Sequence, residues 1–70
     1  MGWRSVMISR PAKLRREHFS LAIEQEQTDF VPFEDIAVIV LNHREINLTH
    51  PVLSACAEYG IGLYATGHNH

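Results

Sequence analysis

The 70-residue sequence has one cysteine, no long apolar run and very little positive charge after its first quarter. Cys56 alone cannot form an intrachain disulfide or a zinc site built on cysteine pairs, and a single thiol is typical of a reducing compartment. The longest apolar run, Ile36 to Leu41, covers six residues, which is strand length and far short of a membrane span. The N-terminus lacks the apolar stretch of a secretory signal. We therefore expect a cytoplasmic protein without a membrane partner.

Positive charge is concentrated at the N-terminal end. Five cations precede the first acidic residue, Glu17: Arg4, Arg10, Lys13, Arg15 and Arg16. Residues 1–16 therefore carry +5 and residues 17–70 carry −7, which gives the net charge of −2. Two interpretations stay open, namely a strand edge kept soluble by charge and a local phosphate-binding strip on an acidic domain. We call Arg10, Lys13, Arg15 and Arg16 the basic strip and take them as the candidate DNA-binding residues.

The composition describes one small folded domain. The chain is 46% hydrophobic and 20% charged, which is typical of a globular protein. A domain of this length hides only about 60% of the surface of its unfolded chain, so its core is marginal and often depends on a partner or a metal. We expect residues 1–70 to form a single domain.

The pattern of apolar residues predicts six or seven short strands and one helix, because the segment at 46–48 is at most a short strand. The strands are expected over residues 3–9, 13–16, 19–25, 30–31, 36–41, 46–48 and 61–65. The strand at 19–25 alternates like one with a solvated face, and the run at 36–41 predicts a central strand buried on both faces. The helix is expected over about 50–59, because Thr49-His50-Pro51 favours a helix start and Gly60 a helix end.

This order of elements predicts an α+β fold, a mainly antiparallel β-sheet and hairpin domain with one covering helix over about 50–59. The helix lies between the strands at 36–41 and 61–65. It could therefore serve as a crossover that makes those two strands parallel.

The five histidines invite a metal hypothesis that the spacing does not favour. His68 and His70 could share one face of an extended tail, whereas His18, His43 and His50 fall in turns or at the helix start. A catalytic zinc needs three protein ligands, so we favour exposed turn histidines and a terminus without metal. No catalytic residue and no metal ligand is assigned. Cys56 is expected to pack as a small hydrophobe, and the pair Glu34-Asp35 to cap the connector before the central strand.

Three ordered segments together carry a resemblance to a known family. They are "MGWRSVMIS", "FEDIAVIVL" and "REINLTHPVLSACAEYGIGLYAT". In this order they closely resemble the N-terminal domain of the CRISPR-associated protein 1 family, the integrase and endonuclease that inserts new spacers into CRISPR arrays. The opening Gly2-Trp3-Arg4 is similar to versions from type II systems. The resemblance spans essentially the whole chain.

The resemblance implies a β-rich N-terminal domain joined, in the family, to a helical catalytic domain that is absent from this chain. The family's catalytic Glu, His and Asp bind a divalent metal, Mg or Mn, in that helical domain. No residue here inherits those roles, so no cofactor and no catalysis are expected of this chain alone. The parent family is a metal-dependent DNA endonuclease and integrase.

The resemblance also implies partners. Family members form homodimers through their β-domains, and two such dimers flank a dimer of CRISPR-associated protein 2. They hold double-stranded DNA, both the prespacer and the CRISPR repeat. Some place an aromatic wedge at the turn after the first strand, where this sequence has Arg10-Pro11 and no aromatic residue.

We therefore expect a dimerisation and DNA-holding domain of the adaptation integrase. Two alternatives belong to other classes. One is a small metal-dependent hydrolase that uses His68 and His70. The other is a purely structural interaction domain.

Overall fold

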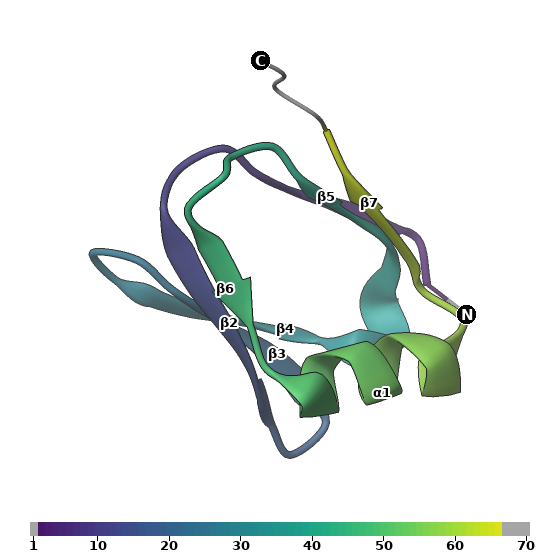
Figure 1. Ribbon diagram of the computed structural model, residues 1–70. Coiled ribbons are helices and arrows are strands. Elements are labelled where there is room, and N and C mark those ends of the chain that lie inside the picture. The colour runs from purple at the N-terminus through teal and green to yellow at the C-terminus, as the bar shows by residue number, and fades with distance from the viewer. Residues whose placement is uncertain (1, 67–70) are drawn as a thin grey trace.

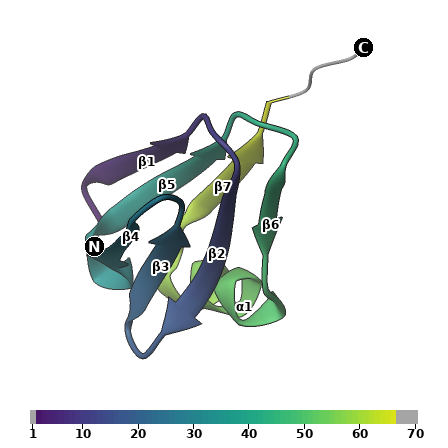
Figure 2. The same ribbon diagram turned by 90° about the vertical axis from the view of Figure 1, so that its left-hand side faces the viewer.

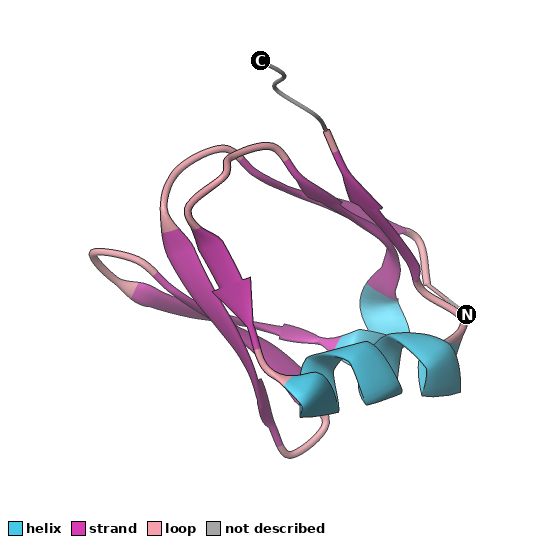
Figure 3. Cartoon of the chain, viewed as in Figure 1, coloured by secondary structure: helices cyan, strands magenta, loops and turns pink. Residues whose placement is uncertain are grey.

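The computed structural model describes residues 2–66. In that range the chain forms seven strands, one 3-10 turn and one α-helix (Figure 1; Figure 3). In chain order these are β1 (Arg4–Ile8), β2 (Ala12–Glu17), β3 (Ser20–Glu24), β4 (Thr28–Pro32), η1 (Phe33–Asp35), β5 (Ile36–Leu41), β6 (Ile46–Leu48), α1 (His50–Tyr59) and β7 (Gly62–Ala65). The predicted α+β class with one covering helix is confirmed, and the helix has the predicted bounds.

The strands form two sheets that face each other. Sheet A has the order β1-β5-β7, and sheet B has the order β4-β3-β2-β6. Figure 2 shows sheet B in front of sheet A, with α1 beside the lower ends of the strands. The chain passes from one sheet to the other several times, so each sheet combines strands that are far apart in the sequence.

The strand pairing is more mixed than the predicted mainly antiparallel arrangement. In the described residues, β2–β3 and β3–β4 pair antiparallel as tight hairpins. The pairings β1–β5, β5–β7 and β2–β6 are parallel, which corrects that part of the prediction. The reason is the long connections, because strands joined through another sheet or through a helix return in the same direction. The parallel pairing of β5 and β7 across α1 was predicted and is confirmed.

The core lies between the two sheets and is closed by α1. Its fully buried large side chains come from both sheets, from η1 and from α1: Leu14, Leu21, Phe33, Ile36, Ile39 and Val52. The rings of Phe33 and Tyr59 are stacked, with 5.5 Å between their centroids, so η1 is fastened to the end of the helix. Among the described residues the core includes no polar or charged residue.

β5 is central in sheet A, as predicted, but it is buried on only one face. Ile36 and Ile39 are completely buried against the core, whereas Val38 and Val40 on the other face remain partly exposed. The expectation of burial on both faces was wrong. Its basis was sound, because an apolar run in a parallel sheet usually has a cover on each side, but the described residues supply only one cover.

β3 departs from its prediction in the opposite direction. Its alternation suggested one solvated face, yet Ala22 on that face is completely buried. Ala22 lies between Arg15 of β2 and Phe30 of β4 in the strand register, and these two longer side chains cover it. The methyl group is thus sheltered on the outer face of the sheet.

The ends of α1 follow the predicted signals. Thr49 is the N-cap residue, and its carbonyl accepts a bond from Val52 N at 3.0 Å, although its side chain makes no capping bond. Pro51 lies in the first turn, where its missing N–H costs nothing. Gly60 ends the helix in the left-handed conformation with φ 68°. Within residues 2–66, no helix has the length and hydropathy needed to cross a bilayer.

Gly2 anchors the start of β1 against β5. A Cβ atom at Gly2 would lie 2.0 Å from the carbonyl oxygen of Ile36, so the backbones approach more closely than any side chain permits. The next residue, Trp3, donates its N–H to the carbonyl of Asp35 at 3.0 Å, which extends the contact between the two segments. The close approach requires glycine at this position.

Candidate nucleic-acid interface

The basic strip is divided between two faces of β2. Side chains of a strand alternate, and the inward positions Ala12 and Leu14 are buried. Lys13 and Arg15 therefore point outward from sheet B, whereas Arg16 follows the inward set at the margin of the core. Arg10 lies in the β1–β2 connection before Pro11. The four cations do not form one continuous surface.

Arg15 is occupied by two carboxylates of its own sheet. It bonds through its guanidinium to Glu24 of β3 and to Glu17 of β2. These hydrogen bonds, that to Glu24 first, raise the pKa of Arg15 above its usual range. The arginine side chain would have to exchange these bonds for a phosphate contact, so Arg15 is a poor candidate for the interface.

Arg16 connects β2 to the helix and to the core. Its Nε donates to the carbonyl of His18 at 2.9 Å, and a terminal nitrogen lies 3.4 Å from a Glu58 carboxylate oxygen on α1. Its guanidinium carbon lies 5.8 Å from the centroid of the buried Phe33 ring. These contacts give Arg16 a packing role.

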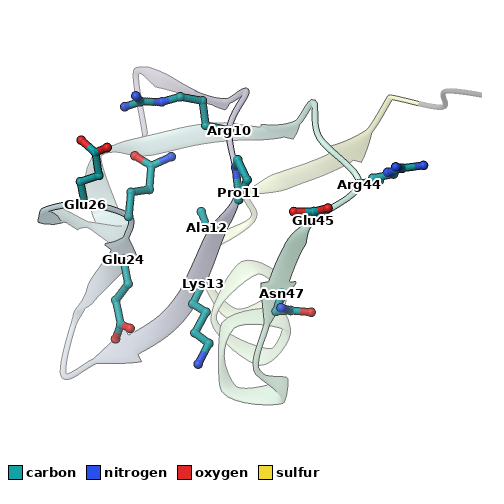
Figure 4. A pocket seen from close by; sticks show the side chains of 10 residues that line it. Arg10, Pro11, Ala12, Lys13, Glu24, Glu26, Arg44, Glu45 and Asn47 are labelled. Atoms are coloured by element: carbon teal, nitrogen blue, oxygen red, sulfur yellow. The ribbon is translucent and has the colours of Figure 1, made fainter.

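Arg10 and Lys13 have no ion pair among the described residues, and both line an open depression on the surface of sheet B. It has a volume of about 840 Å³. Arg44, from the loop before β6, lines the same depression (Figure 4). The parallel pairing of β2 with β6 brings Arg44 to the basic strip, because Ala12 lies opposite Ile46. Arg44 was not among the predicted site residues, because no local signal in the sequence connects it to residues 31 or more positions earlier.

Acidic side chains share this depression with the three cations. Glu24, Glu26 and Glu45 also line it. The three cations and three carboxylates of the depression sum to zero, and Arg15, which pairs with Glu24, also pairs with Glu17, so it adds no net positive charge. Figure 4 shows Arg10, Lys13 and Arg44 extending in three different directions. The arrangement does not converge on one small anion, and it suits separate phosphates of a polymer.

Trp3 does not join the basic strip. It precedes β1, while Arg10 follows it, and a strand of five residues is about 16 Å long. The indole is 74% exposed, and the guanidinium of Arg4 lies 5.8 Å from the ring centroid. The aromatic side chain belongs to sheet A, at the opposite end from the depression.

The other candidates of the sequence show no assembled catalytic or metal site in residues 2–66. His43 accepts a bond from Glu45 N at 3.0 Å, and His50 lies 3.5 Å from the Ser54 hydroxyl. His68 and His70 lie outside the described residues. No group of three or more His, Cys, Asp or Glu residues within that part of the chain could hold a metal ion.

Cys56 follows its prediction, whereas the acidic pair Glu34-Asp35 does not. Cys56 is buried in the apolar face of α1, and this burial raises the pKa of its thiol. A protonated, buried thiol packs as a hydrophobe and is a weak nucleophile. The prediction that Glu34-Asp35 caps the connector before β5 was wrong, because both residues lie within η1, its N-cap residue is Pro32 and no side-chain cap bond is formed.

Comparison with known proteins shows what the chain is similar to. No protein-family model matches the chain. Over 64 residues, or 90% of the chain, it is 45% identical to the CRISPR-associated endonuclease Cas1 of Neisseria meningitidis serogroup C (strain 8013). The resemblance to Cas1 is confirmed. The match covers 21% of that relative, so the chain spans about a fifth of its length.

Solved Cas1 structures share the fold. A CAS1 protein from Thermotoga maritima superposes with a TM-score of 0.77 at 19% identity, over 89% of this chain and 20% of that one. TtCas1 in a DNA complex gives a TM-score of 0.77 at 24% identity, over 89% and 23% of the two chains. At these identities the likeness shows the fold alone, and it places the two-sheet arrangement among Cas1 structures.

Proposed function

We propose that the chain is the N-terminal, DNA-holding and dimer-forming domain of a Cas1 integrase that adds spacers to CRISPR arrays. The observation that carries this proposal is the 45% identity with a Cas1 endonuclease over nearly the whole chain. The described residues hold no cluster that fits a divalent metal, so the proposal assigns no metal-dependent step to residues 2–66. Catalysis and the Mg or Mn ion belong, in this proposal, to the helical remainder of the full protein.

The partners in this proposal are a second copy of the chain, a Cas2 dimer and duplex DNA. A TtCas1 structure is a DNA complex, which supports the nucleic-acid partner. The marginal core of so short a domain supports the homodimer, because a self-complementary contact adds buried surface that the monomer lacks.

The DNA contact in this proposal is made by Arg10, Lys13 and Arg44 rather than by the whole basic strip. These three line one surface depression, whereas Arg15 and Arg16 are engaged with Glu24 and Glu58. The acidic neighbours keep the local field weak. Binding should therefore be modest and lost steeply as salt rises, as for contacts made only with phosphates.

The test is the salt dependence of binding to a short DNA duplex. Each phosphate contact contributes about 0.9 to the slope of log K against log salt, so Arg10→Gln/Lys13→Gln/Arg44→Gln should reduce the slope by about 2–3. Neutralising the complete basic strip should also reduce the slope, through Arg10 and Lys13. Fluorescence anisotropy at several salt concentrations measures the slope.

The matched control is Arg15→Gln/Arg16→Gln, which removes two charges from the same strand. Because both arginines are committed to carboxylates, this variant should leave the slope nearly unchanged. If the triple variant keeps the wild-type slope, the depression is not part of the DNA surface. If the control lowers the slope as much as the triple variant, the interface extends over the whole basic strip.

A further inference from the structure

A second pocket lies where the β2–β3 turn meets η1 and the end of α1. Figure 2 shows this turn and the helix at the same end of the two sheets. The pocket has a volume of about 270 Å³ and shares no lining residue with the depression described above. Its lining residues come from five elements or turns, so the fold builds it and no single segment does. We call it the aromatic pocket: Phe19, Ser20, Pro32, Glu34 and Tyr59.

The aromatic walls of this pocket belong to segments that the fold holds in place. Phe19 is 72% exposed, but its carbonyl accepts a bond from Phe33 N at 2.9 Å. The preceding carbonyl, that of His18, accepts a bond from Arg16 Nε at 2.9 Å. The Tyr59 ring is stacked on the buried ring of Phe33. A wall that is fixed before a ligand arrives lowers the ordering cost of binding.

The polar groups of the aromatic pocket are acceptors. Within residues 2–66 the Glu34 carboxylate has no ion pair, whereas Glu17, Glu24 and Glu58 each pair with an arginine. The Ser20 hydroxyl can accept a further bond, and none of the lining residues is a cation. An unpaired carboxylate beside aromatic rings is complementary to a cation that also has apolar surface.

The chain itself holds an arginine in the same kind of environment. The guanidinium carbon of Arg16 lies 5.8 Å from the centroid of the Phe33 ring, and a terminal nitrogen lies 3.4 Å from a Glu58 carboxylate oxygen. A guanidinium stacks on rings and donates two parallel bonds to a carboxylate, while an ammonium is more strongly hydrated. Arginine therefore fits a ring and a carboxylate together better than lysine does.

We propose that the aromatic pocket binds an arginine side chain presented by a partner polypeptide. The guanidinium donates to the Glu34 carboxylate and to the Ser20 hydroxyl, and its plane lies against the aromatic walls. The apolar stem of the arginine packs on the Pro32 ring. This site is separate from the proposed function, because it adds a protein-binding site to a domain that we propose to hold DNA.

The charge of the aromatic pocket argues against a nucleic acid as its ligand. A phosphate would meet the Glu34 carboxylate, and no lining residue supplies a cation to attract it. The cations that suit phosphates line the other depression. The two sites thus select ligands of opposite charge.

The experiment titrates the 70-residue chain with Nα-acetyl-arginine amide and follows backbone amide signals by two-dimensional NMR. Because one side chain is bound, the dissociation constant should be on the order of 1–10 mM, and the signals of Phe19, Ser20 and Glu34 should shift. Nα-acetyl-citrulline amide has nearly the same shape without the charge. It should bind at least about threefold more weakly, because it loses the ion pair and the attraction to the rings.

Two variants separate the contributions of charge and ring. Glu34→Gln keeps the shape of the side chain and should weaken arginine binding about 2–5-fold while reducing the preference over citrulline. Phe19→Ala should weaken both compounds, because it removes a wall. The matched control is Glu26→Gln, which removes an exposed carboxylate from the β3–β4 turn outside the pocket and should leave the constant unchanged. All three side chains are exposed, and the spectra check that each variant is folded.

Four results would overturn the inference. Pocket signals that stay unshifted at about ten times the expected dissociation constant would exclude the site. Equal binding of the citrulline compound would exclude recognition of charge, and equal or tighter binding of Nα-acetyl-lysine amide would exclude arginine as the preferred side chain. Tighter binding of free arginine than of the capped compound would indicate a site for the amino acid and not for a polypeptide. The DNA salt titration is independent of these results, because the two sites share no residue.

Discussion

Replacing Gly2 by alanine should destabilise the chain far more than such a small change near a terminus normally does. The added Cβ atom would lie 2.0 Å from the oxygen of Ile36, 2.2 Å from its carbonyl carbon and 2.6 Å from the nitrogen of Ala37. All three are backbone atoms of the start of β5, so no side chain can turn aside. The N-terminal segment must move away from β5.

The size of the effect follows from that movement. Real Cβ contacts essentially never fall below 3.0 Å, so the segment has to withdraw by at least 1.0 Å from Ile36 O. A displacement of that size breaks the 3.0 Å bond from Trp3 N to Asp35 O. Overpacking and a lost hydrogen bond together cost about 1–3 kcal/mol of the free energy of unfolding.

Urea unfolding measures the loss, and the single tryptophan makes the assay specific. For a chain of this size the slope is about 1 kcal/mol per M, so the midpoint should fall by about 1–3 M. Trp3 emission should also shift before global unfolding, because its anchoring bond is lost. Gly60→Ala is the control, since nothing lies within 4 Å of its Cβ position and it strains only the local φ of +68°.

The control should lose about 1 kcal/mol without an early change in Trp3 emission, because the strain is confined to the end of α1. If Gly2→Ala unfolds within about 0.5 kcal/mol of wild type and its tryptophan emission is unchanged, the close approach of Gly2 to β5 does not exist in solution.

Two further changes test local features. His18 has φ 57°, in the left-handed region that glycine adopts without strain. His18→Gly should therefore raise the midpoint of thermal unfolding by about 2–8 °C, whereas His18→Ala should not. An equal response of both variants would contradict backbone strain at His18. Burial raises the pKa of Cys56 above its ordinary value of 9.0, so the unfolded chain loses this proton first as pH rises, and stability should fall above about pH 9. Cys56→Ala should lack this part of the decrease, as urea titrations at pH 8 and pH 10 would reveal; parallel pH profiles would show that the thiol is not buried.

The elements with strong local signals could be predicted from the sequence. The helix at His50–Tyr59 has proline in its first turn and Gly60 in the left-handed C-cap, and both signals act within a few residues. The run at Ile36–Leu41 has six apolar residues, four of them β-branched, and this length and composition favour a buried strand. The alternation of apolar and charged residues also predicted correctly that Leu14 faces the core and Lys13 faces outward.

Pairing between distant segments could not be predicted. The strand β6 has only three residues, too few to show the alternation of apolar and polar residues that marks a strand. Its parallel pairing with β2 nevertheless places Arg44 at the same depression as Arg10 and Lys13. Likewise, the contact of Arg16 with Glu58 joins residues 42 positions apart. The basic strip is therefore continuous in the sequence but divided in space. A cluster of charges along the chain does not reveal which distant carboxylates will pair with it in the fold.

The position of β5 in sheet A has a consequence for synthesis. Its segment Ile36–Leu41 is uncharged, free of proline and glycine, and rich in β-branched residues, the composition of segments that assemble into fibrils. In the folded chain β1 and β7 occupy its two edges. β7 ends 24 residues after β5, so at about 5–20 residues per second one edge of β5 stays open for roughly 1–5 seconds on the ribosome. The completion of β7 is thus the step that protects the nascent chain from aggregation, and variants that loosen β7 should first reduce yield during synthesis.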